Sequence, residues 1–190
     1  MTASFLISNY ENYYGKVFMS MTEVTIRPLR RDDRARVERI LRATKVFLEA
    51  EVLCALELID VYLNNADQKD YQLACAVDAA DQPVGYVCYG PTPMTFGTYD
   101  LYWIAADPAW HGRGVGSLLI EYVERQVCQP SSIATATEPA LLLVIETSSL
   151  PRYESARRLY QRHHYREVAR IPDFYADGDD RVLYTKRFGK

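Results

Sequence analysis

Three glycines occupy alternate positions directly before a helical pattern, in the stretch AWHGRGVGSLLIEYVE over residues 109–124. They are Gly112, Gly114 and Gly116. A glycine loses more backbone entropy on folding than any other residue, so three of them weaken a regular element. Such a run is expected where the backbone must adopt conformations or contacts that a side chain prevents, and here it stands at the start of a helix.

Three structures account for glycines at this place. One is a plain turn without a function. A second is the dinucleotide fingerprint G-x-G-x-x-G, but Ser117 stands where its third glycine belongs, and the motif follows the fourth predicted strand rather than the first. A P-loop is excluded because the GK[ST] ending is missing. The third is a diphosphate cradle, in which main-chain N–H groups and the helix dipole bind the anion and Arg113 adds a cation.

The composition places the chain among single globular domains. It has 190 residues, of which 48% are hydrophobic and 25% charged, values typical of a folded domain. We expect the domain to span residues 22–190, with residues 1–21 as an N-terminal extension. The net charge of −3 argues against a general nucleic-acid binder, whose affinity depends on neutralising phosphates.

Neither a membrane nor a metal is expected as a partner. No apolar run reaches the roughly 20 residues of a membrane-spanning helix, and the N-terminus lacks the basic start of a signal peptide. The four cysteines lie in apolar segments without the spacing of a metal site, so we expect buried, reduced thiols in a cytoplasmic protein. They are Cys54, Cys75, Cys88 and Cys128.

The hydrophobic period changes along the chain and predicts an α/β fold with a mixed sheet. Alternating or continuous apolar runs indicate strands, and apolar residues three or four apart indicate helices. The predicted order is β-α-α-β-β-β-α-β-α-β-β. The strands are expected at 23–29, 71–79, 82–90, 98–107, 140–147, 165–171 and 181–188. The helices are expected at 30–44, 46–65, 114–128 and 152–163.

With these elements in place, the sequence resembles the GNAT superfamily of acyl-CoA-dependent N-acyltransferases. The stretch HGRGVG over 111–116 matches the family segment (Q/R)-x-x-G-x-(G/A), with His111 in the first position. The pair Leu159-Tyr160 matches an L-Y pair late in the helix after the fifth strand. The element order agrees over residues 23–188, which covers nearly the whole chain.

The resemblance implies a single-domain GNAT-like fold whose sheet is splayed between strands 4 and 5. It also implies an N-acetyltransferase that moves an acetyl group from acetyl-CoA to a primary amine, carried by a small molecule, a peptide or a protein, by direct attack and without a metal. The diphosphate would lie against the glycine segment, which comprises His111, Gly112, Arg113, Gly114, Val115, Gly116 and Ser117. The pantetheine arm would lie along strand 4 at Ile104, Ala105 and Ala106. Whether the protein forms a homodimer is left open.

The resemblance also suggests catalytic groups. Tyr160 would protonate the departing thiolate as general acid. The alternative is a purely structural tyrosine packed in the core. The base would be Asp100, Glu146 or water, although a carboxylate at a strand end is often only solvated or salt-bridged. By strand alternation we expect Asp100 to share a face with Tyr102 and Ile104.

Two positions depart from the family pattern, and the acceptor stays open. Tyr153 stands where family members often carry Asn, and His164 stands where Gly commonly closes the helix, so we expect a left-handed cap there. Carboxylates in 46–65 and 173–180 either form an acidic rim that attracts a cationic amine or are merely solvated. A different class of function is a non-catalytic acyl-CoA-binding module that has lost the chemistry.

Overall fold

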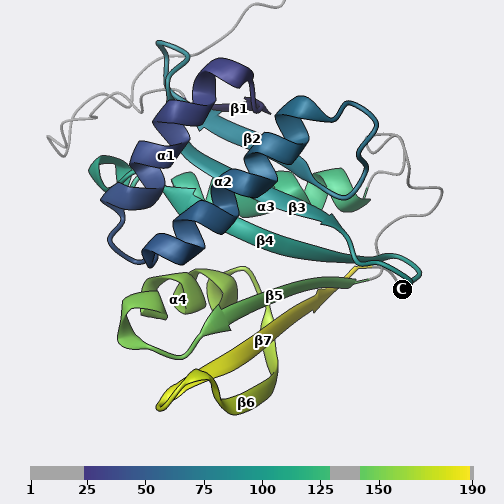
Figure 1. Cartoon of the computed structure of the whole chain (residues 1–190). Helices are drawn as coiled ribbons and strands as arrows, with labels where there is room; N and C mark the ends of the chain where they lie inside the picture. The colour runs from purple at the N-terminus through teal and green to yellow at the C-terminus, as the bar shows by residue number, and fades with distance from the viewer. Residues whose placement is uncertain (1–23, 129–141, 189–190) are drawn as a thin grey trace, which may run out of the picture.

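The computed structural model describes residues 24–128 and 142–188, and Figure 1 shows them as one sheet with helices on both faces. The strands are β1 (Thr25–Pro28), β2 (Gln72–Val77), β3 (Pro83–Pro91), β4 (Thr98–Ala106), β5 (Leu142–Ser148), β6 (Arg166–Ala176) and β7 (Asp179–Arg187). The helices are α1 (Arg34–Ala43), α2 (Glu49–Asn64), α3 (Val115–Cys128) and α4 (Glu154–Arg162). Short 3-10 turns are η1 (Arg31–Asp33), η2 (Pro108–Trp110) and η4 (Pro151–Tyr153).

The order of elements confirms the predicted α/β fold. The seven strands of the described residues lie in the order β1-β2-β3-β4-β5-β7-β6. Neighbouring strands run antiparallel except β4 and β5, which run parallel. The predicted extension 1–21 and the first two residues of the predicted strand 140–147 lie outside the described residues.

The sheet is splayed between β4 and β5, as expected. Their parallel ladder runs only from Thr98 opposite Leu142 to Leu101 opposite Ile145. Both strands continue beyond it, β4 to Ala106 and β5 to Ser148. The two strands therefore part after four paired residues, and Figure 1 shows them diverging.

Helices cover the two faces of the sheet and define two cores. On the α2 face, α1 and α2 pack against β2 and β3 through residues such as Ile40, Ile59 and Tyr86. On the α3 face, α3 and α4 pack against β3, β4 and β5 through residues such as Leu119 and Tyr160. Each strand of the centre thus buries side chains on both faces, as its apolar sequence requires.

Strand β4 contains a bulge at Tyr102. Its partner β3 pairs Tyr89 with Leu101 and the preceding Cys88 with Trp103, so one residue of β4 has no counterpart. Leu101 packs on the α3 face, whereas Tyr102 and Trp103 both pack toward the α2 face. A bulge inserts one residue and reverses the alternation beyond it.

The bulge overturns one expectation about Asp100. Tyr99 and Leu101 on either side of it belong to the α3-face core, so the pleat turns Asp100 toward the α2 face with Tyr102. Ile104, beyond the bulge, packs on the α3 face. The prediction that Asp100 shares a face with Ile104 is therefore wrong, because simple alternation does not hold across the extra residue.

Helix α2 begins later than predicted, at Glu49 rather than at residue 46. The Glu51 carboxylate accepts a hydrogen bond from the Leu48 N–H at 2.6 Å, which fixes the start of the helix. The Leu48 side chain, just before the helix, is 56% exposed, whereas Val52, Leu56 and Ile59, which follow at helical spacing, are buried.

The hairpin of β6 and β7 also differs from the prediction. The predicted strands 165–171 and 181–188 leave 172–180 between them, but β6 runs to Ala176 and the tight turn contains only Asp177 and Gly178. The pairing jumps from Ile171–Arg181 to Ala176–Asp179, so residues 172–175 bulge out of the ladder. This bulge carries Phe174 and Tyr175, both of which are exposed.

The cysteines are free but not all buried. Cys75 and Cys88 lie in the core, whereas Cys54 and Cys128 lie on exposed helix positions, which corrects the expectation of four buried thiols. Within residues 24–128 and 142–188, no helix has the length and apolar character needed to cross a membrane. The same residues hold no group of three or more His, Cys, Asp or Glu side chains placed to bind a metal.

Candidate functional site

The glycine segment before α3 uses backbone conformations that favour glycine. Gly112 has φ +75° and Gly114 has φ +80°, both in the left-handed region. A Cβ atom at either position would meet no atom within 4 Å. The backbone conformation, and not a lack of space, therefore calls for glycine at these two positions.

Position 116 requires glycine for a different reason. It lies in the first turn of α3, and a Cβ atom there would stand 3.0 Å from Cδ2 of Leu159 on α4. The absent side chain lets α4 pack directly against the start of α3. The glycine segment thus combines two left-handed turns with one close approach between helices.

The start of α3 presents backbone N–H groups without a partner inside the helix. The Leu118 N–H donates to the Gly114 carbonyl at 3.0 Å, which begins the helical bonding. The preceding N–H groups of Val115, Gly116 and Ser117 therefore have no intrahelical acceptor. Together with the helix dipole they form a site that suits an anion such as a diphosphate.

Charged side chains surround the same segment. Arg113 is exposed, and its guanidinium carbon lies 4.9 Å from the centre of the Trp110 ring. The exposed His111 ends the η2 turn. Asp107 holds this turn, because one carboxylate oxygen accepts from the Ala109 N–H at 2.9 Å and the other from Arg36 at 2.6 Å. The sequence pattern placed Asp107 only at the end of a predicted strand. Its position directly before Pro108 was the signal that could have indicated the start of a turn.

The open edge of β4 lies between the glycine segment and β5. The described residues pair β4 with β5 only as far as Leu101, so the edge from Tyr102 to Ala106 has no strand partner among them on that side. Ile104 and Ala106 pack on the α3 face and Ala105 is buried on the other. The structure therefore brings the predicted pantetheine stretch beside the opening.

Tyr160 lies on α4, on the α3 face, and is only 4% exposed. Its ring centre is 5.8 Å from that of Tyr184 and 6.4 Å from that of Tyr165. Burial raises the pKa of the Tyr160 hydroxyl, with a smaller contribution from Tyr184. The hydroxyl therefore keeps its proton at neutral pH.

Asp100 is a half-buried carboxylate on the α2 face of β4. Its Oδ2 accepts a hydrogen bond from the Thr92 hydroxyl at 2.6 Å. Burial raises the pKa of Asp100, and the negative charge of Glu146 raises it further, while the Thr92 hydrogen bond and the charge of Arg181 act in the opposite direction. The net result is a carboxylate that binds a proton more readily than usual.

Glu146 lies on the same face but is already engaged. Leu143 and Ile145 of β5 belong to the α3-face core, so Glu146 points the other way. It forms an ion pair with Arg181 and accepts a hydrogen bond from the Tyr175 hydroxyl at 2.8 Å. The partner residues come from β7 and from the bulge of β6, and their positions beside Glu146 depend on strand pairing that the sequence pattern does not reveal.

The two ends of α4 show what replaces the family residues. Tyr153, in the Asn position, is buried, and its hydroxyl donates to Oε1 of Glu51 at 2.7 Å. His164, just beyond the helix, has φ +66°, which confirms the predicted left-handed cap.

Most carboxylates of the expected acidic rim have partners of their own. On α2, Glu49 pairs with Arg42 and Asp60 with Arg34. In the β6–β7 hairpin, Asp180 pairs with Arg170, and the buried Asp179 accepts a hydrogen bond from Ser148. Paired carboxylates attract a distant cation less than free ones. The arrangement therefore favours carboxylates without a role in binding over an acidic rim that attracts a cationic amine.

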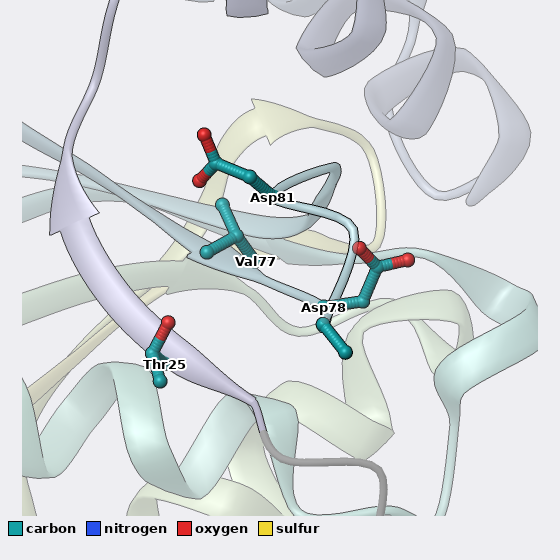
Figure 2. A pocket seen from close by; sticks show the side chains of 5 residues that line it. Thr25, Val77, Asp78 and Asp81 are labelled. Carbon is teal, nitrogen blue, oxygen red and sulfur yellow. The ribbon is translucent and has the colours of Figure 1, made fainter.

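A separate hollow of about 310 Å³ lies at the β1 edge of the sheet (Figure 2). It is lined by Thr25, Val77, Asp78, Ala79 and Asp81. The Asp81 carboxylate is occupied by Arg27 at 2.6 Å and Arg30 at 2.8 Å. The hollow contains none of the predicted site residues.

Known proteins resemble this chain in sequence and in fold. The sequence profile of the acetyltransferase (GNAT) domain matches residues 69–167. A GNAT-family acetyltransferase from Desulfovibrio desulfuricans is 34% identical, with a TM-score of 0.77 over 87% of this chain and 99% of that one. No curated protein matches the chain.

More distant structures agree in fold alone. Arabidopsis thaliana NAA60 in complex with acetyl-CoA is 17% identical, with a TM-score of 0.66 over 87% of this chain and 99% of that one. The ribosomal-protein-S18-alanine N-acetyltransferase of Escherichia coli is 14% identical, with a TM-score of 0.65 over 88% and 96%. From the domain profile and the 34% identical relative, the chain belongs to the GNAT family of acetyltransferases and is an acyltransferase.

Proposed function

We propose that this protein transfers an acetyl group from acetyl-CoA to a primary amine by direct attack. One observation carries the proposal: β4 and β5 part between an amide-lined helix start on one face and a half-buried carboxylate, Asp100, on the other. The arrangement offers an anion site and a proton acceptor on opposite sides of a single opening.

The chain's own groups fit coenzyme A. The N–H groups of Val115, Gly116 and Ser117, with the guanidinium of Arg113, would hold the diphosphate. The unpaired edge of β4 over 104–106 would bind the pantetheine arm. Among structures of the same fold, NAA60 was solved with acetyl-CoA and an aminoglycoside 6'-N-acetyltransferase with coenzyme A, which supports this choice of cosubstrate.

Acetyl-CoA supplies an acetyl thioester, and the protein must make the amine nucleophilic. An ammonium group has no lone pair, so it must first lose a proton. We assign that proton to Asp100, directly or through a water molecule, since its raised pKa suits a general base. Glu146 is the weaker candidate, because Arg181 and Tyr175 already occupy its oxygens.

Tyr160 would complete the transfer as the general acid. The new N–C bond forms as the C–S bond breaks, and the Tyr160 hydroxyl gives its proton to the departing sulfur. The acylated nitrogen releases its extra proton to solvent, and solvent restores the proton of Tyr160 and removes the one held by Asp100. The contact of Leu159 with the start of α3 supports this role, since it holds α4 beside the diphosphate site.

Thiol release from acetyl-CoA, measured with a panel of primary amines, tests the proposal. The expected result is release of free coenzyme A together with an N-acetylated amine identified by mass spectrometry. Binding of acetyl-CoA without turnover of any amine would contradict the proposed activity. Calorimetry that detects no association with coenzyme A would remove the cofactor assignment as well.

A further inference from the structure

One hydrogen bond joins two parts of the chain that are far apart in sequence. The Tyr153 hydroxyl donates to Oε1 of Glu51 at 2.7 Å, across 102 residues. Tyr153 ends the η4 turn, which follows β5, and Glu51 lies in the first turn of α2. We call this pair the Tyr153–Glu51 bridge.

The bridge crosses the region where the sheet is splayed. Helix α2 packs over the β4 side of the sheet, where Tyr102 and Trp103 meet its core. Tyr153 belongs to the other side, five residues beyond the end of β5 at Ser148. Figure 1 shows the first turns of α2 facing α4 across the gap between β4 and β5. The bridge therefore connects the two sides on the α2 face.

Both ends of the bridge are held in place. Tyr153 is 7% exposed, and its ring meets that of Phe47 edge to face with centres 6.3 Å apart. The guanidinium of Arg152 covers the same ring at 5.4 Å. The second oxygen of Glu51 accepts from the Leu48 N–H. Neither partner is free to rotate away without breaking another contact.

We propose that the Tyr153–Glu51 bridge determines acceptor specificity, by limiting the width of the amine that reaches the opening. The inference rests on the proposed function. Because the diphosphate site lies on the α3 face, the amine must approach from the α2 face, and there the bridge closes part of the opening. The class of acceptor that fits is a small primary amine rather than a lysine on a polypeptide.

Competing acceptors measure this effect. The small acceptor is 2-phenylethylamine, and the bulky one is an octapeptide with a blocked N-terminus and a single lysine. Two readouts are used: kcat/KM for each amine, and the dissociation constant of each amine from the protein saturated with coenzyme A. The bulky-to-small preference is the ratio of the two kcat/KM values, or the inverse ratio of the two dissociation constants. A higher preference reports a wider path.

The expected results distinguish loss of the whole Tyr153 side chain from loss of its hydrogen bond alone. Tyr153→Ala raises the bulky-to-small preference at least tenfold, and Tyr153→Phe, which loses only the hydroxyl, raises it about threefold. The KM for acetyl-CoA stays within twofold in both. Glu51→Gln keeps one oxygen to accept from the Tyr153 hydroxyl, although the bond from the Leu48 N–H is lost, and its preference stays near that of the wild type. Glu51→Ala loses both bonds, and its preference changes as in Tyr153→Phe.

Glu49→Ala is the matched control, because it removes a carboxylate from the same turn of α2 whose partner is Arg42 on α1. Its preference should equal that of the wild type. A ratio that stays within twofold in folded Tyr153→Ala, or a rise in the KM for acetyl-CoA alone, overturns the inference. If the wild type acetylates no amine, the proposed function fails, and the dissociation constants still decide whether the bridge limits width.

Discussion

The two faces of the opening between β4 and β5 are built differently. On the α3 face, the proposed cofactor groups lie in one continuous stretch, residues 104–117, and depend on backbone conformation. On the α2 face, the groups near the proposed amine path meet from distant segments: Glu146 with Tyr175, and Glu51 with Tyr153. The first face needs a local sequence, and the second needs the whole fold.

This difference suggests how acceptor choice changes within a fold that keeps its cosubstrate. A side chain on the α2 face is replaceable without disturbing the left-handed turns at Gly112 and Gly114 on the other. Function resides in sites placed on a fold rather than in the fold itself. The following substitutions probe each face in turn, beginning with the largest expected effect.

Tyr160→Phe tests whether Tyr160, on the α3 face, is the general acid. Loss of a general acid lowers kcat by about 10²–10⁴, while the KM for acetyl-CoA changes little. Steady-state kinetics with the best amine measures it. Tyr184→Phe is the control, because that hydroxyl lies on a neighbouring ring but bonds to Glu167, and its kcat should stay within about threefold. Equal losses in both variants would make Tyr160 a packing residue.

Asp100→Asn tests the α2 face in the same way. We expect kcat/KM at neutral pH to fall about 100-fold. In the wild type, activity should rise as the pH passes upward through the raised pKa of Asp100, because only the carboxylate accepts the proton. That limb of the pH profile should vanish in the variant. A limb that persists in Asp100→Asn would assign the base to water or to another group.

Gly114→Ala tests the backbone of the cofactor face. A side chain in the left-handed region costs roughly 1–2 kcal/mol, so the KM for acetyl-CoA should rise about 5- to 30-fold with kcat little changed. Gly178→Ala is matched in backbone strain, since Gly178 has φ +74°, but lies in the β6–β7 turn. It should lower the melting temperature and leave that KM unaltered. The same KM in both variants would argue against the cradle.

Thr92→Val gives the smallest change and concerns pH alone. The Thr92 hydroxyl stabilises the charged form of Asp100, so its removal raises the pKa of that carboxyl. The acidic limb of kcat/KM should move to higher pH, with the plateau preserved. A limb that stays in place, or moves to lower pH, would show that Asp100 does not set it.

The comparison of faces also explains what the sequence predicted. The apolar periods predicted every described helix and strand, and the glycines before α3 indicated an anion site, because both signals are local. The bulge at Tyr102 escaped prediction, since it depends on how β3 pairs with β4. The Arg181–Glu146 pair and the Tyr153–Glu51 bridge escaped it as well, because long-range side-chain contacts leave no periodic trace in the chain.

The single additional residue at Tyr102 divides β4 into two halves of opposite phase. In the first half Asp100 points to the α2 face, where we propose that the amine arrives, and in the second Ile104 points to the α3 face, where we propose that the acyl donor binds. Deleting that residue would restore regular pleating, with Trp103 following Leu101 on the α2 face, and would leave Asp100 and Ile104 on opposite faces. The extra residue therefore places two neighbouring side chains, Tyr102 and Trp103, toward the α2 face, where a regular strand would place one.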